Sequence, residues 1–136
     1  MRVPLKQSAP CPCGGAFYGN CCRPLHRGER QAPTAVALMR SRYSAFALGE
    51  VAYLWKTLAP EHIERKRTES RVLADLREST RTQRFMGLHI EAVSEEGDSA
   101  TVTFFARVFR SGKERSFRET SLFRRVDGEW RYVKVM

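Results

Sequence analysis

The sequence predicts an α+β fold: a small N-terminal zinc knuckle, followed by about three helices packed on a curved four-stranded antiparallel sheet. All four cysteines of the 136-residue chain fall within residues 11–22. Apolar residues then recur with a helical period between residues 35 and 79, and with a period of two from about residue 88 onward. Because the helices precede the strands and do not alternate with them, the pattern is typical of an α+β domain.

The first element is the cysteine cluster, which reads C-P-C, then seven residues, then C-C. Four thiolates this close together can surround one tetrahedral zinc ion with bonds of about 2.3 Å. The glycines between the pairs allow tight turns and bring backbone N–H groups near the sulfurs. Two disulfides are the alternative, but vicinal and C-x-C bridges are strained. We therefore expect one structural zinc ion, with the ligands Cys11, Cys13, Cys21 and Cys22.

The helical part begins after a polar linker at residues 27–33. Thr34 is a good N-cap, and a helical pattern follows over residues 35–48. A shorter apolar run at 51–58 predicts a second helix, which ends before a proline. A third helix is expected at 69–79.

The strands are predicted at residues 88–93, 102–109, 117–123 and 130–135, separated by turn sequences such as Asp-Gly. The second strand carries apolar side chains on both faces. This pattern indicates a curved sheet that wraps around a helix.

The motifs carry two resemblances. The stretch C-P-C-G-G-x-x-Y-x-x-C-C resembles the SEC-C zinc motif, with Gly15 where a serine is usual, a departure that we expect to leave the ligands untouched. The segment 38–46 is similar to the signature helix of the YchJ-like family. That family joins an N-terminal SEC-C motif to a cone-shaped domain like nuclear transport factor 2, of the cystatin-like fold. Further matches are Tyr53-Leu54 with Thr57 and Pro60, Glu119-x-Ser121-x-Phe123, and Gly128-x-Trp130-x-Tyr132.

The resemblance implies a zinc module at residues 1–30 and a cone domain at residues 31–136. It implies no reaction, because the family has no established one. A cone of this kind hosts both enzymes and simple binding modules, so fold does not decide function.

The charge is unevenly distributed. The chain carries +9, and residues 1–30 contain five basic residues and one acidic residue, a net +4. We expect Arg23, Arg27 and Arg30 to flank the zinc and to face an acidic partner surface. Nucleic-acid binding is disfavoured, because no basic stripe with interleaved aromatics is present. The leading hypothesis is a non-enzymatic adaptor with a protein partner. The SEC-C motif resembles the small zinc element at the C-terminus of the SecA translocase, and this resemblance implies a partner in export, in quality control or on the ribosome.

The expected cellular compartment follows from two features that the sequence does not contain. No apolar run approaches 18 residues, so we expect no membrane span. The first ten residues lack the apolar stretch of a signal peptide. We expect a cytoplasmic protein with reduced thiols.

A second hypothesis concerns the polar residues of the cone. Glu119 shares a predicted inward face with Phe117 and Phe123, and a buried glutamate needs a cation. Arg42 and Arg40 both flank the apolar stripe of the helix at 35–48, so either is predicted to pair with Glu119.

The same face suggests supporting roles for two hydroxyls. Tyr43 is expected in the core with its hydroxyl at the edge of a pocket, and Ser121 is expected to hydrogen-bond Glu119. The alternative function is therefore a small-molecule-binding or enzymatic cone with Arg42, Tyr43 and Glu119 in its cavity. Four sulfur ligands make a closed metal site, and no nucleophile–base set is evident, so the balance leans away from an enzyme. His26 is an alternative zinc ligand.

Overall fold

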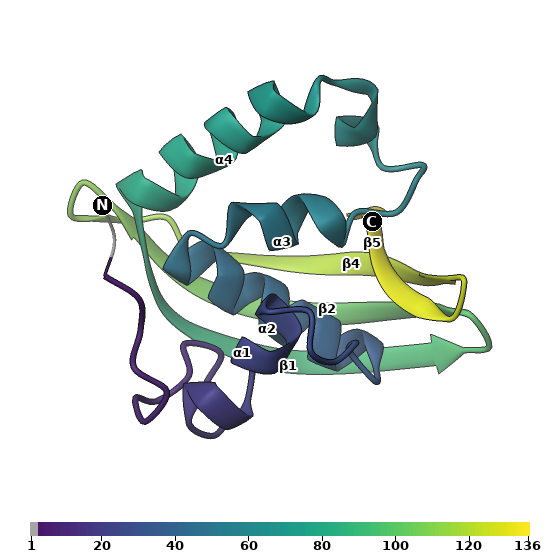
Figure 1. The fold of residues 1–136 in the computed structure, drawn as a ribbon, viewed down its shortest axis with the longest axis horizontal. Coiled ribbons are helices and arrows are strands. Elements are labelled where there is room, and N and C mark those ends of the chain that lie inside the picture. Colours follow the sequence, from purple (N-terminus) through teal and green to yellow (C-terminus); the bar gives the residue numbers. More distant parts are fainter. Residues whose placement is uncertain (1–2) are drawn as a thin grey trace.

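The computed structural model describes residues 3–136 and shows helices packed on one face of an antiparallel sheet (Figure 1). The helices are α1 (Arg23–His26), α2 (Ala35–Leu48), α3 (Val51–Lys56) and α4 (Glu69–Thr82), with 3₁₀ turns η1 (Tyr18–Asn20) and η2 (Ile63–Lys66). The strands are β1 (Gln83–Glu96), β2 (Ser99–Arg110), β3 (Lys113–Glu114), β4 (Phe117–Val126) and β5 (Glu129–Val135). The α+β prediction is confirmed. The short elements α1 and β3 were not predicted, and β1 begins five residues earlier than expected because α4 runs into it without a loop.

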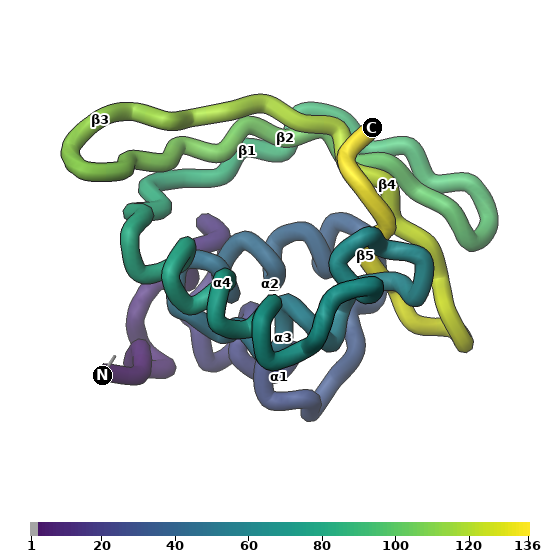
Figure 2. Tube along the Cα trace, turned by 90° about the horizontal axis from the view of Figure 1, so that it is seen from above, coloured from purple at the N-terminus to yellow at the C-terminus, as the bar shows by residue number. Residues whose placement is uncertain are grey.

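The sheet has the order β1-β2-β4-β5, with β3 paired to β2, and all its strand pairs are antiparallel. Bulges interrupt β1 between Phe85 and Gly87 and between Ile90 and Ala92. Bulges increase the local twist of a sheet. Figure 2 shows the result: the sheet forms one curved layer, and β5 bends toward the helices beneath it. The predicted curvature is thus present.

Helix α2 lies at the centre of the molecule. The Thr34 hydroxyl accepts a hydrogen bond from the Ala37 N–H at 3.0 Å, and Gly49 ends the helix in a left-handed conformation at φ 74°. We expected a single apolar stripe, but Ser41, Arg42, Tyr43, Ser44 and Ala45 are all buried. In Figure 1, α3 and α4 lie to one side of α2, and the N-terminal segment lies to the other. The helix therefore has few exposed positions.

The inward face of β2 and β4 forms the other half of the core. Val102 pairs with Ser121, and Phe104 pairs with Glu119. Val102, Phe104, Ser121 and Phe123 are buried, which confirms the predicted inward face. Among residues 3–136, no helix is long and apolar enough to cross a membrane, and the longest two have 14 residues each.

Candidate metal centre and cone cavity

The four cysteines come together as predicted. One ligand atom from each of Cys11, Cys13, Cys21 and Cys22 lies within 4.8 Å of the others. The Sγ–Sγ distance is 3.5 Å between Cys13 and Cys21, and 3.9 Å between Cys21 and Cys22. A tetrahedron with metal–sulfur bonds of about 2.3 Å has edges of about 3.8 Å. The cluster therefore has the size and the donor set of a four-sulfur metal site.

The loop between the cysteine pairs is shaped around the sulfurs. The Gly14 N–H donates to the Cys11 carbonyl at 3.0 Å, and Gly14 takes φ 86°, a region that favours glycine. A Cβ on Gly15 would lie 2.9 Å from Cys21 Sγ and 3.3 Å from Cys13 Sγ. We expected the glycine at position 15 to leave the ligands untouched. All four cysteines do come together around this glycine, and a larger residue at position 15 would crowd two of the four sulfurs.

The protonation of the cluster explains why it needs a cation. Hydrogen bonds from Cys11 and Cys22 lower the pKa of the Cys13 thiol to about 2. Burial, together with the hydrogen bond to Cys13, raises the pKa of Cys21 to about 12. Hydrogen bonds with Cys11 and Cys13 also raise the pKa of Cys22 above its usual range. Cys13 therefore ionises more readily than Cys21 and Cys22, and a divalent cation would supply the charge that releases their protons.

Three of the four cysteines are buried, and Cys21 is partly exposed. Cys13, Cys22 and Cys11 expose 0%, 2% and 4% of their surface. Four sulfur donors with no open position are typical of a structural site, whereas catalytic zinc keeps a position for water or substrate. The residues present therefore fit a structural metal ion.

A half-buried histidine connects this knuckle, which we define as residues 3–30, to helix α2. His26 Nε2 lies 2.8 Å from the Ser41 carbonyl oxygen, so Nε2 carries the proton and donates. Nδ1 then accepts from the Tyr18 hydroxyl at 2.8 Å. The prediction of His26 as an alternative metal ligand is wrong, because both ring nitrogens are already used. Its role in joining the two regions was missed, since sequence spacing does not reveal which helix a histidine will meet.

Two further contacts join the knuckle to the rest of the molecule. Arg40 Nη1 donates to the Cys13 carbonyl at 2.8 Å, which places a cation beside the sulfur cluster. Leu25 belongs to the main hydrophobic core together with Leu38 and Trp130. The knuckle is therefore packed into the cone domain.

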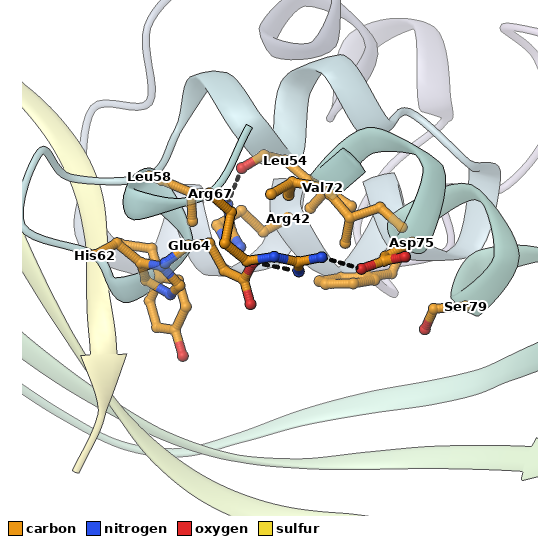
Figure 3. Close-up of a pocket in the computed structure, with 12 residues that line it drawn as sticks. Arg42, Leu54, Leu58, His62, Glu64, Arg67, Val72, Asp75 and Ser79 are labelled. Carbon is orange, nitrogen blue, oxygen red and sulfur yellow. Dashed lines mark hydrogen bonds and ion pairs between the residues drawn. The ribbon is translucent and has the colours of Figure 1, made fainter. Parts of the chain in front are cut away.

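On the other side of α2 lies a cavity of about 400 Å³ (Figure 3). It is open to solvent between α3, α4, η2 and β5. Most of its lining is apolar or aromatic, and the polar groups lie at its floor and its mouth. The lining residues are Arg42, Phe46, Leu54, Leu58, His62, Glu64, Arg67, Val72, Asp75, Leu76, Ser79 and Tyr132.

Arg42 forms part of the cavity wall. Its Nη1 donates to the Leu54 carbonyl at 2.9 Å and to the Thr57 hydroxyl at 2.6 Å. Its guanidinium carbon lies 4.7 Å from the centre of the Tyr132 ring. Burial lowers the pKa of Arg42 to about 10. The side chain thus remains a cation, but one held in an unfavourable environment.

The predicted ion pair with Glu119 is wrong. Within residues 3–136, Glu119 makes no salt bridge with Arg40 or Arg42, which instead bond the carbonyls of Cys13 and Leu54. Glu119 does lie on the inward face, where it pairs with Phe104 in the strand register, but it is only half-buried. Burial alone raises the pKa of the Glu119 carboxyl. The assignment of the strand face was correct and the assignment of the partner was not.

Tyr43 lies in the core as expected, but its hydroxyl and Ser121 differ from the expected arrangement. The Tyr43 hydroxyl accepts the Gly87 N–H at 2.8 Å, at the first bulge of β1, and Tyr43 is not part of the cavity lining. Ser121 is buried, and within residues 3–136 no hydrogen bond joins it to Glu119. Burial raises the pKa of Tyr132, and a hydrogen bond with Ser121 partly offsets this rise. Of the proposed cavity set, only Arg42 lines the cavity.

The three arginines expected to face a partner are not equivalent. Arg23 lies 4.0 Å from Glu29, and Arg27 bonds Glu50 at 3.1 Å. Arg30 is exposed and makes no ion pair within the described part of the chain. Two of the three charges are thus partly neutralised.

Comparison with known sequences shows the relationship of the whole chain. Residues 34–135 match the family described as "YchJ, middle NTF2-like domain". A UPF0225 protein of Chromobacterium violaceum is 42% identical over 137 residues, covering 98% of this chain and 96% of its own. A UPF0225 protein of Deinococcus radiodurans is 38% identical over 125 residues, covering 91% of this chain and 86% of its own.

Solved structures with the same architecture bear the motif in their descriptions. The solution structure of a SEC-C motif containing protein from Rhodopseudomonas palustris has a TM-score of 0.82 at 36% identity, and the match covers 93% of this chain and 96% of that one. The crystal structure of a SEC-C motif containing protein from Psychrobacter arcticus has a TM-score of 0.80 at 25% identity, with 94% and 82% covered. Both similarities extend over the knuckle and the cone.

Proposed function

This chain belongs to the YchJ-like family, and we propose that it works as a non-enzymatic interaction module in which a structural zinc ion holds the knuckle in shape for a protein partner. The observation that carries the proposal is the contrast between the knuckle's sulfurs and its loop. Three of the four cysteines are buried, and four sulfur ligands would leave a bound metal no open position for a substrate. The loop at residues 14–17 that encloses them is exposed, and Phe17 presents 58% of its surface.

Zinc is the metal that suits this donor set best. Four thiolates in a tetrahedral arrangement favour zinc over magnesium or calcium, which prefer oxygen ligands. Four thiolates around Zn²⁺ carry a formal charge of about −2, and the Arg40 guanidinium beside Cys13 offsets part of it.

The proposed partner surface is acidic. Residues 1–30 carry a net +4, and the knuckle exposes an aromatic side chain, a residue type enriched in binding surfaces. Because Arg23 and Arg27 are paired with acids, Lys6 and Arg30 are the cations we expect to meet the partner. Phe17 would supply the apolar contact.

The test is capture of a partner by the intact protein, followed by direct binding measurements with the purified partner. The variant Phe17→Ser with Lys6→Glu and Arg30→Glu should lose binding by at least about tenfold, and wild-type binding should weaken as salt rises. The matched control, Arg110→Glu with Lys113→Glu, makes the same charge change at the β2–β3 turn. A partner that binds both variants equally well, or a salt-independent affinity, would contradict the proposal.

A further inference from the structure

Arg42 is a buried cation without a buried anion. It exposes 7% of its surface, and within residues 3–136 no carboxylate forms a salt bridge with it. A buried charge without a counter-charge is costly, and folded proteins usually compensate it with a partner. Among the described residues, its partners are a carbonyl, a hydroxyl and the face of the Tyr132 ring.

The guanidinium still has donors to offer. It carries five N–H groups, and the two hydrogen bonds to Leu54 and Thr57 both come from Nη1. No protein acceptor for Nε or Nη2 is present among the described residues, and Arg42 forms part of the cavity wall. Two neighbouring N–H donors facing a cavity match the two oxygens of a carboxylate.

The rest of the cavity has the character of a binding site for an apolar molecule. A volume of about 400 Å³ lies within the usual range for small-ligand sites. Phe46, Leu54, Leu58, Val72 and Leu76 supply the apolar surface. In Figure 3, Leu54 of α3 and Val72 of α4 lie near Arg42.

The charges at the mouth do not compete for Arg42. Arg67 bonds Glu64 at 2.9 Å and Asp75 at 2.5 Å, so it joins η2 to α4 across the opening (Figure 3). Both acids are therefore held by a different arginine. Arg67 and its two acids together carry a net −1, so Arg42 is the cation of this lining that has no acid partner. Burial lowers the pKa of His62 and raises that of Tyr132, which keeps both neutral near pH 7.

We propose that this cavity binds a small organic monocarboxylate, whose carboxylate pairs with the free N–H groups of Arg42 and whose apolar body fills the space between α3 and α4. The single positive charge of Arg42 matches a monoanion, and a phosphate or a dicarboxylate would leave negative charge unpaired in an apolar site. The inference rests on Arg42 and its cavity, and it is independent of the knuckle and of any protein partner.

The probes are four monocarboxylates of increasing apolar size, acetate, benzoate, octanoate and 2-naphthoate, each beside its uncharged primary amide. Binding to the full-length, metal-loaded protein is measured by calorimetry and by NMR shifts. We expect affinity to rise with apolar size, and 2-naphthoate to bind at least about tenfold more tightly than 2-naphthamide, because only the acid makes charge-assisted hydrogen bonds.

Three variants separate the contributions. Arg42→Met should remove the preference for acid over amide, and Arg42→Lys should reduce the affinity for 2-naphthoate by about tenfold, because lysine keeps the charge but lacks the paired donors. Ser79→Trp should block binding by filling the cavity from α4 while leaving Arg42 intact. Arg71→Met, at an exposed position of α4, is the control and should leave binding unchanged.

The proposal is overturned if no carboxylate of the panel binds at millimolar concentration, or if acid and amide bind equally. It is also overturned if 2-naphthoate still binds the Ser79→Trp variant with its wild-type affinity, which would place the molecule elsewhere. Circular dichroism and metal content check that each variant is folded. Ser79→Trp and Arg42→Lys keep the test decisive if Arg42→Met does not fold.

Discussion

Arg40 and Arg42 are two residues apart on the same helix, yet they serve two different regions. Successive residues of a helix are about 100° apart, so the two side chains leave α2 about 160° apart around its axis. Arg40 reaches the knuckle and bonds the Cys13 carbonyl, whereas Arg42 reaches the cavity wall and bonds the Leu54 carbonyl. On the knuckle side, Arg40 and His26 are both held by hydrogen bonds to protein groups. The cavity side contains open volume and a cation without an acid.

The difference shows what each region is suited to do. Around the knuckle, Tyr18, His26 and Ser41 form a continuous chain of hydrogen bonds, and such a network fixes one arrangement of the chain. Around the cavity, Arg42 has N–H donors without a protein acceptor among the described residues, and the empty volume beside them can accept a ligand. One region therefore maintains shape, and the other can respond to a ligand.

Removal of the metal should produce the largest effect. Purified protein should hold about one zinc per chain, and a chelator should loosen residues 3–30. Because Leu25 lies in the main core, we also expect the cone to lose about 2–5 kcal/mol of stability, the usual cost of losing a buried leucine. Hydrogen exchange and thermal unfolding measure the two effects.

The control for metal removal is re-addition. Zinc should restore both signals, and magnesium should restore neither. Metal-free protein with unchanged hydrogen exchange in residues 3–30 would show that the knuckle does not need the ion. A chelated cone with wild-type stability would show instead that the two regions are independent.

His26 gives the next largest effect, because it joins the two regions. His26→Phe leaves the Ser41 carbonyl and the Tyr18 hydroxyl without this partner, and should cost about 1–3 kcal/mol for each buried group left unpaired. Ser44 and Tyr53 also contact this site, so part of the loss can be recovered. Chemical denaturation of wild type and variant measures the difference.

The same histidine predicts a pH dependence. Burial lowers the pKa of His26 below its usual 6.5. The unfolded chain therefore takes up a proton first as pH falls below about 6.5, and stability decreases from there down to the folded pKa. Above about 6.5 the contribution is constant. His26→Phe should flatten this part of the profile, with zinc content checked at each pH, and an equally steep profile in the variant would assign the effect to another group.

The sequence predicted the knuckle well because ligand identity and spacing are local. The four cysteines and the glycine turn lie within twelve residues, so no long-range contact has to be known. The strands were predicted for a similar reason, since alternation of side chains is read from neighbours.

The cavity could not be predicted in the same way. Its wall combines Arg42 with Thr57 and Tyr132, whose positions depend on how β5 is joined to the loop after α3. The Tyr132 N–H donates to the Thr57 carbonyl, and the Ala59 N–H donates to the Tyr132 carbonyl, both at 2.8 Å. The prediction chose Glu119 as the partner because a strand pattern gives the face of a residue but not its distance from a given helix.

The two arginines should also differ in stability. Arg42→Met removes a buried charge together with two hydrogen bonds, and these effects oppose each other, so we expect a change of less than about 2 kcal/mol in either direction. Arg40→Met should instead loosen the loop of the knuckle, seen as faster hydrogen exchange at residues 13–17. A loss above about 4 kcal/mol in Arg42→Met would mean that the cation is compensated by the fold after all.

Glu119→Gln should give the smallest effect. An ion pair with Arg42 would have made Glu119→Gln cost several kcal/mol, but the carboxyl is half-buried and unpaired with either arginine. Its pKa is raised by burial, so the folded state holds the proton more tightly than the unfolded state. Stability from this group is therefore present below about pH 4.5 and is lost as pH rises through the folded pKa.

At pH 7 the glutamine variant should consequently match or slightly exceed the wild type, by less than about 1 kcal/mol, because water still screens the carboxylate. At pH 4 the difference should shrink further, since both side chains are then uncharged. Urea unfolding at the two pH values measures this. A loss of more than about 2 kcal/mol of stability at pH 7 would instead show that Glu119 pairs with a cation. Arg42 would then be the first candidate for that cation, and it would no longer be free to bind a ligand.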